Sequence, residues 1–89
     1  MSNATKLKHL LDELDALDAA CRIAENEYFE SGFAADAEDA FNEACKAENA
    51  AFERAAIAVV EFTGGFTLGA ARTMLLLKRD ALRDIVSVL

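Results

Sequence analysis

The sequence predicts an all-α fold, an antiparallel helical hairpin completed by a third long helix. The 89 residues include no proline and only four glycines, and apolar side chains recur at helical spacing through three long stretches. Glycine stands at both breaks between these stretches, where it favours the end of a helix. One domain, residues 1–89, accommodates the whole pattern. We expect helices at about residues 5–30, 36–63 and 67–89.

The first helix carries an unbroken alternation of three- and four-residue steps between apolar positions. This spacing is typical of helices that pack knobs-into-holes along their whole length. Ser31 and Gly32 follow its last turn and predict its end. The apolar positions are Leu7, Leu10, Leu14, Leu17, Cys21, Ala24 and Tyr28.

The second helix begins at Asp36, because acidic side chains are favoured at the amide end of a helix. It ends before Gly64, and one charged residue, Glu48, projects into the centre of its broad apolar face. The apolar face consists of Ala37, Phe41, Ala44, Cys45, Ala51, Phe52, Ala55, Val59 and Phe62.

The link between these two helices is short, so they should fold back on each other as a hairpin. A turn centred near Phe33 places Leu14 level with Phe52 and Cys21 level with Cys45. A disulfide between the two cysteines is topologically possible. In a reducing compartment we expect free thiols instead.

The third helix opens with Thr67 as a cap and continues to the end of the chain. Lys78 lies in the middle of its apolar face, as Glu48 does in the second helix. We hypothesise that Glu48 and Lys78 form a buried pair, within a subunit or across a dimer; the alternative is that each reaches solvent along its own stem. The face consists of Leu68, Ala71, Met74, Leu75, Leu82, Ile85, Val86 and Leu89.

The apolar face of the third helix is as wide as those of its partners. It therefore predicts a three-helix bundle that associates as a homodimeric helical bundle.

The net charge of −7 is distributed unevenly. Residues 1–63 carry 14 acidic and 5 basic side chains, whereas residues 64–89 carry 2 acidic and 4 basic ones. A surface of this sign attracts basic protein partners and disfavours direct binding of nucleic acid or anionic lipid. No apolar run is long enough to span a membrane, and no signal peptide is recognisable, so we expect a cytoplasmic protein.

Enzymatic activity is not expected. His9 is the single histidine and is predicted to face solvent, and neither cysteine has a histidine neighbour to activate it. A carboxylate-bridged metal site in a bundle would also need inward-facing Glu-x-x-His pairs, which the chain lacks. We therefore predict no catalytic residue, no metal and no cofactor.

The remaining interpretation is a protein–protein interaction module with two candidate surfaces. One is an acidic ridge for a basic partner, and the other is a basic stripe on the third helix. Either set of charges could instead be solvated, or could balance the other. The ridge comprises Asp12, Asp15, Asp18, Asp39, Glu43 and Glu53, and the stripe comprises Arg72, Arg79 and Arg83.

Two alternative functions depend on these surfaces. In size, charge and helicity the chain is similar to small acidic helical proteins of phages and mobile elements, including some anti-CRISPR inhibitors. That similarity implies an acidic surface that mimics nucleic acid. In the second alternative, a dimeric regulator binds RNA or DNA through the arginine stripe.

Overall fold

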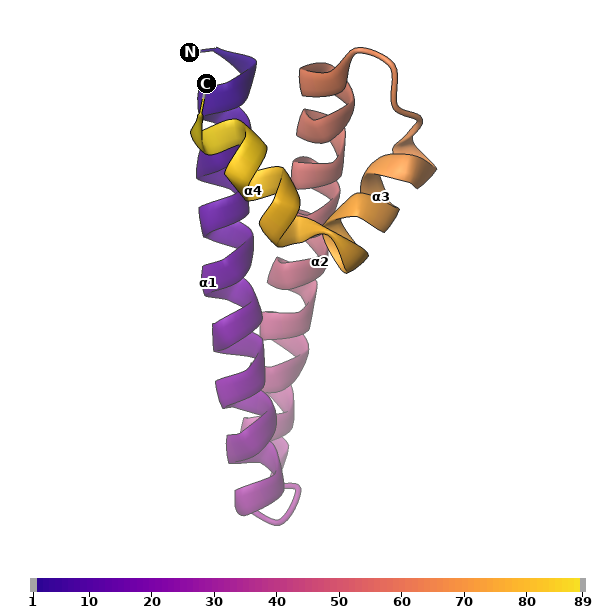
Figure 1. Ribbon diagram of the computed structural model, residues 1–89. Helices are drawn as coiled ribbons and strands as arrows, with labels where there is room; N and C mark the ends of the chain where they lie inside the picture. Colours follow the sequence, from indigo (N-terminus) through magenta and orange to yellow (C-terminus); the bar gives the residue numbers. More distant parts are fainter. Residues whose placement is uncertain (1, 89) are drawn as a thin grey trace.

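The computed structural model describes residues 2–88 and is all-helical over that range. Helices α1 (Asn3–Glu30) and α2 (Ala35–Thr63) form the predicted antiparallel hairpin. Helices α3 (Leu68–Leu77) and α4 (Arg79–Ser87) follow it. They lie across one half of the hairpin, α3 against α2 and α4 against α1, and leave the other half bare (Figure 1). The molecule is therefore elongated, 46 × 23 × 23 Å.

The ends of the hairpin helices follow local sequence signals. The Ser2 hydroxyl accepts a hydrogen bond from the Thr5 amide (3.1 Å) and caps α1. Gly64 ends α2 in the left-handed conformation (φ 70°), where its amide donates to the Val60 carbonyl at 2.9 Å. The predicted boundaries of α1 and α2 are thus correct to within two residues.

The predicted hairpin register is confirmed. The Cys21 and Cys45 sulfurs lie 3.5 Å apart, and both cysteines are free thiols. Nearer the termini, Lys6 Nζ bonds Glu61 Oε2 at 3.0 Å, and Arg54 pairs with Glu13. This is the alignment predicted from the matching of the large apolar side chains on the two faces.

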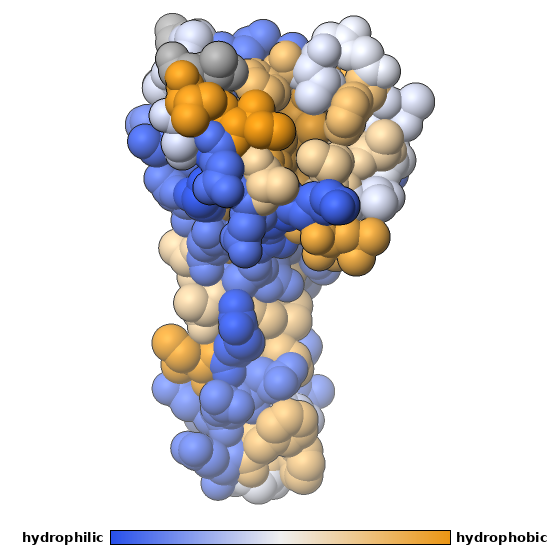
Figure 2. Space-filling model, in the orientation of Figure 1, coloured by the Kyte–Doolittle hydropathy of each residue, from blue (hydrophilic) through white to orange (hydrophobic). Residues whose placement is uncertain are grey.

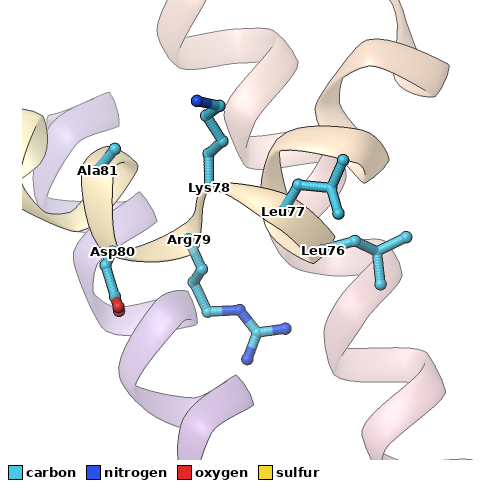
Figure 3. A pocket seen from close by; sticks show the side chains of 6 residues that line it. All are labelled: Leu76, Leu77, Lys78, Arg79, Asp80 and Ala81. Atoms are coloured by element: carbon cyan, nitrogen blue, oxygen red, sulfur yellow. The ribbon is translucent and has the colours of Figure 1, made fainter.

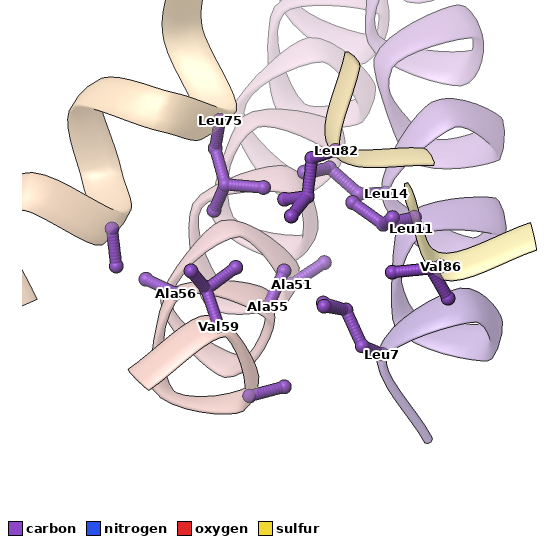
Figure 4. Close-up of a cluster of buried hydrophobic side chains, with 12 residues drawn as sticks. Leu7, Leu11, Leu14, Ala51, Ala55, Ala56, Val59, Leu75, Leu82 and Val86 are labelled. Carbon is purple, nitrogen blue, oxygen red and sulfur yellow. The ribbon is translucent and has the colours of Figure 1, made fainter. Parts of the chain in front are cut away.

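The hydrophobic core lies in one half of the molecule only. All fully buried side chains of the described chain come from the first half of α1, the second half of α2, and helices α3 and α4. Figure 4 shows leucines of α1, α3 and α4 gathered over the small side chains of α2. We call this half the head. Its core consists of Leu7, Leu11, Leu14, Ala51, Ala55, Ala56, Ala58, Val59, Ala71, Leu75, Leu82 and Val86.

The prediction of one long third helix is wrong. The helix breaks at Lys78 (φ −136°, ψ 33°), so residues 2–88 form four helices where three were expected. The break frees the Leu75 carbonyl, and Arg79 Nε donates to it at 3.1 Å. Because of this corner, α3 can pack on α2 while α4 turns to pack on α1. Leu89, predicted on the same apolar face, lies outside the described residues.

Candidate partner-binding surface

Most residues of the two predicted charged surfaces pair with each other in the head. Arg79 Nη1 contacts Asp15 at 3.2 Å and also pairs with Asp18. Arg83 bridges Asp12 and Asp15. These arginines lie on α4 and the aspartates on α1, so the ion pairs join the two helices. The three aspartates are therefore not a free acidic ridge, and the two arginines are not a free basic stripe.

Arg72 and Glu53 form a similar contact between α3 and α2. Two guanidinium nitrogens, Nε and Nη2, each donate to one carboxylate oxygen of Glu53 at 2.9 Å. The hydrogen bonds from Arg72 lower the pKa of Glu53. Every arginine of the predicted stripe is thus engaged by an acid of a neighbouring helix.

Glu48 does not pair with Lys78 within the subunit. Lys78 is exposed at the helix break, and the described chain gives it no ion pair. Figure 3 shows Lys78 and Arg79 pointing in opposite directions from the corner. Arg79, and not Lys78, lines a cavity together with Glu48. Pairing of Glu48 with Lys78 across a dimer stays a prediction.

Glu48 instead faces Asp18 on the opposite helix of the hairpin. The hydrogen bond to Asp18, the partial burial of the side chain and the charge of Asp18 together raise the pKa of Glu48 to about 7. Burial alone would raise the pKa of Asp18, but hydrogen bonds from Glu48 and Arg79 outweigh burial and lower it. Below about pH 7 the two carboxyl groups therefore share one proton next to Arg79.

We expect Glu48→Gln to remove a pH dependence of stability between about pH 4.5 and about pH 7. Folded Glu48 keeps its proton up to about pH 7, whereas an unfolded chain loses it near 4.5. The folded state thus binds more protons in this window, and the free energy of unfolding falls as the pH rises. Because water screens a half-buried pair, the fall should be about 1 kcal/mol, measured by urea unfolding.

A wild-type and a Gln variant that lose equal stability over this window would contradict the assignment to Glu48. The ionisation of Asp18 affects stability at a lower pH. Because its pKa lies below the ordinary 3.8, its contribution is present above that value and is lost as the pH falls through the lowered pKa.

A shallow cavity of about 260 Å³ opens beside this carboxyl pair. Phe52 and Leu76 supply its apolar wall, and Arg79 lines it together with Asp18, with which it pairs. It lies at the corner where α3 ends and α4 begins, next to the bare half of the hairpin. It is lined by Asp18, Glu48, Asn49, Phe52, Leu76 and Arg79.

The bare half of the hairpin, residues 21–47, is the distal arm. No residue of it is fully buried. It carries seven acidic and two basic side chains, a net charge of −5 out of the −7 of the whole chain. Of these acids only Glu43 makes an ion pair within the described chain, with Lys46 at 3.5 Å. Asp39 and Glu43, the remaining residues of the predicted ridge, lie here. The arm acids are Glu25, Glu27, Glu30, Asp36, Glu38, Asp39 and Glu43.

Four aromatic rings gather at the end of the distal arm and form the aromatic tip. Tyr28 stands at their centre, with ring centroids 5.1 Å from Phe33 and 5.9 Å from both Phe29 and Phe41. Phe29 and Phe33 are more than half exposed. The sequence interpretation missed this cluster. The signal that could have found it was a phenylalanine inside the predicted turn, where polar residues are usual.

The single histidine and the two cysteines are the side chains that the sequence analysis considered for catalysis. His9 is exposed, and no group of three or more histidine, cysteine or acidic side chains in residues 2–88 could hold a metal ion. Burial and the neighbouring Cys45 and Glu48 raise the pKa of Cys21 to about 11, which keeps it a thiol at neutral pH. No described helix combines the length and apolar character that a membrane crossing requires.

Comparisons of the chain with protein-family models, with curated proteins and with solved structures find no match.

Proposed function

We propose that this protein is a non-enzymatic protein–protein interaction module whose distal arm binds a basic surface of a partner protein. The observation that carries the proposal is the separation of charge. Aspartates of the head face arginines, whereas the distal arm holds a net charge of −5. Such a surface attracts basic proteins and raises their rate of association.

Charge reversal on the arm should weaken binding more than the same reversal on the head. Glu27→Lys with Glu38→Lys changes the arm, and Asp80→Lys with Asp84→Lys is the matched control. All four acids are exposed, and each pair includes one acid from the first turn of a helix. We expect the arm variant to retain basic partners from a cell extract at least about tenfold less than wild type, as quantified by mass spectrometry.

The head variant changes the net charge by the same four units and should retain those partners. Equal losses in both variants would show that only net charge matters and would contradict a binding role for the arm. Circular dichroism of both variants checks that they remain folded.

A nucleic-acid mimic that inhibits a nucleic-acid-binding protein is a second candidate function. It is favoured by the same arm carboxylates, because most of them have no counter-ion in the described chain. Under this hypothesis short DNA or RNA duplexes would compete with the protein for the partner. A partner that binds the arm and duplex at the same time would argue for the general module.

Direct nucleic-acid binding by Arg72, Arg79 and Arg83 has little support, because each guanidinium is already bound to carboxylates. Self-association as a homodimer stays a prediction. It is supported by Leu76 and Leu77, which lie exposed next to each other at the corner between α3 and α4.

A further inference from the structure

The aromatic tip stands at the end of the distal arm, remote from the core of the head. Figure 2 shows apolar side chains among hydrophilic ones at this end of the molecule. Phe33 is 60% exposed, and its ring meets those of Tyr28 and Phe29 edge-on, with centroids 5.1 and 5.7 Å apart. The rings thus form one continuous apolar surface without contributing to the buried core.

Phe33 adopts a backbone conformation that opposes folding. Its φ of 69° lies in the left-handed region, which a bulky residue rarely occupies and which glycine tolerates easily. Gly32 before it has a φ of 71°. A glycine or asparagine at position 33 would make the same turn with less strain. The phenylalanine therefore places an exposed ring at a cost in stability, as is typical of functional positions.

Charge identifies the kind of partner that fits this surface. Glu27 and Glu30 are next to Tyr28 and Phe29 in the sequence, and Asp36 follows Phe33 by three residues, so acidic residues flank the aromatic residues along the chain. An aromatic anchor with a polar rim is typical of protein interfaces. A second copy would bring the same acidic residues, and an anionic membrane would repel the tip. A basic rim around an apolar groove complements it.

We propose that the aromatic tip is the anchor of partner binding and inserts into an apolar groove rimmed by lysine or arginine on a protein partner. This inference rests on the proposed function, because it assumes that the distal arm is the binding surface. It adds the apolar contact that selects one basic partner among many.

Two synthetic peptides of about 20 residues test the inference. Both carry the same number of lysines; one has leucines at helical spacing and the other has alanines in their place. Tyr28 is the only tyrosine and the chain has no tryptophan, so tyrosine fluorescence reports on the tip itself. We expect the leucine peptide to bind wild type at least about tenfold more tightly than the alanine peptide.

Phe33→Gly should abolish this preference, so that the leucine peptide binds no more tightly than the alanine peptide. Its midpoint of thermal unfolding should stay the same or rise, because the strain is removed. Ile23→Ala is the matched control, since Ile23 is 59% exposed on the same arm and belongs to no aromatic contact. Ile23→Ala should keep the preference for the leucine peptide.

A preference that survives Phe33→Gly would overturn the inference. The proposed function would still stand if Glu27→Lys with Glu38→Lys weakened the binding of both peptides. It would fail if that charge reversal weakened the binding of neither peptide. Light scattering that finds a dimer in wild type and a monomer in Phe33→Gly would assign the tip to a second copy and also overturn the inference. If wild type bound anionic vesicles and Phe33→Gly did not, that result would also overturn the inference.

Discussion

Leu14→Ala is expected to lower the free energy of unfolding by about 3 kcal/mol, as measured by urea unfolding followed by circular dichroism. Leu14 is fully buried in the core that joins α1 to α2 and to the crossing helices. The smaller side chain removes apolar contacts and leaves a cavity that rigid helices fill only partly. In a domain of this size such a loss is a large share of the total stability.

The control for Leu14→Ala is Ile23→Ala on the distal arm. Ile23 is mostly exposed, so its truncation should change the free energy of unfolding by less than about 0.5 kcal/mol. Similar losses in the two variants would contradict the division of the molecule into a head with a core and an arm without one.

Arg79→Ala is expected to lower the free energy of unfolding by about 2 kcal/mol at neutral pH. The variant loses the contacts to Asp15 and Asp18 and the hydrogen bond to the Leu75 carbonyl. Arg79 and Asp18 are each only about one-fifth exposed, so the aspartate would keep an incompletely solvated charge with no cation beside it. The loss should shrink at high salt, measured by urea unfolding at two ionic strengths.

Arg72→Ala is the matched control for Arg79→Ala. Arg72 also bonds a carboxylate of the hairpin, but this pair is about half exposed, and water replaces the lost partner easily. The free energy of unfolding of Arg72→Ala should therefore be much closer to that of wild type. Equal losses in both variants would show that burial at the corner does not strengthen the Arg79 contacts.

The hairpin could be predicted from the sequence because its causes are local or periodic. Leu7 and Leu14 recur on one face of α1 and are buried, and Cys21 meets Cys45 at the expected level. The alignment predicted from the large side chains of both faces is the one that the structure adopts.

The corner at Lys78 could not be predicted because no proline or glycine marks it. The run from Leu68 onward has a continuous helical pattern, and local propensity favours one helix. The structure breaks it where α3 must follow α2 and α4 must reach α1. The contacts of Arg79 with Leu75 and Asp18 accompany that change of direction. The contact between Arg79 and Asp18 joins residues 61 positions apart, which periodicity does not report.

The candidate site was only partly predictable for the same reason. The sequence indicated an acidic protein with a basic third segment, but it did not show that Arg83 and Asp12 neutralise each other. Once these pairs are formed, the unpaired acids lie mostly on the distal arm, together with the aromatic tip. The location of the binding surface thus depends on which charges the fold brings together.

By itself the sequence determined the helical class, the hairpin and its register, and the excess of negative charge. These follow from the spacing of apolar residues, the glycines at the breaks and the composition. Only the tertiary structure decided that the third segment bends, that the arginines turn inward and that one half of the hairpin stands bare. Those outcomes depend on contacts between distant residues, whose combined free energy overrides local helix propensity.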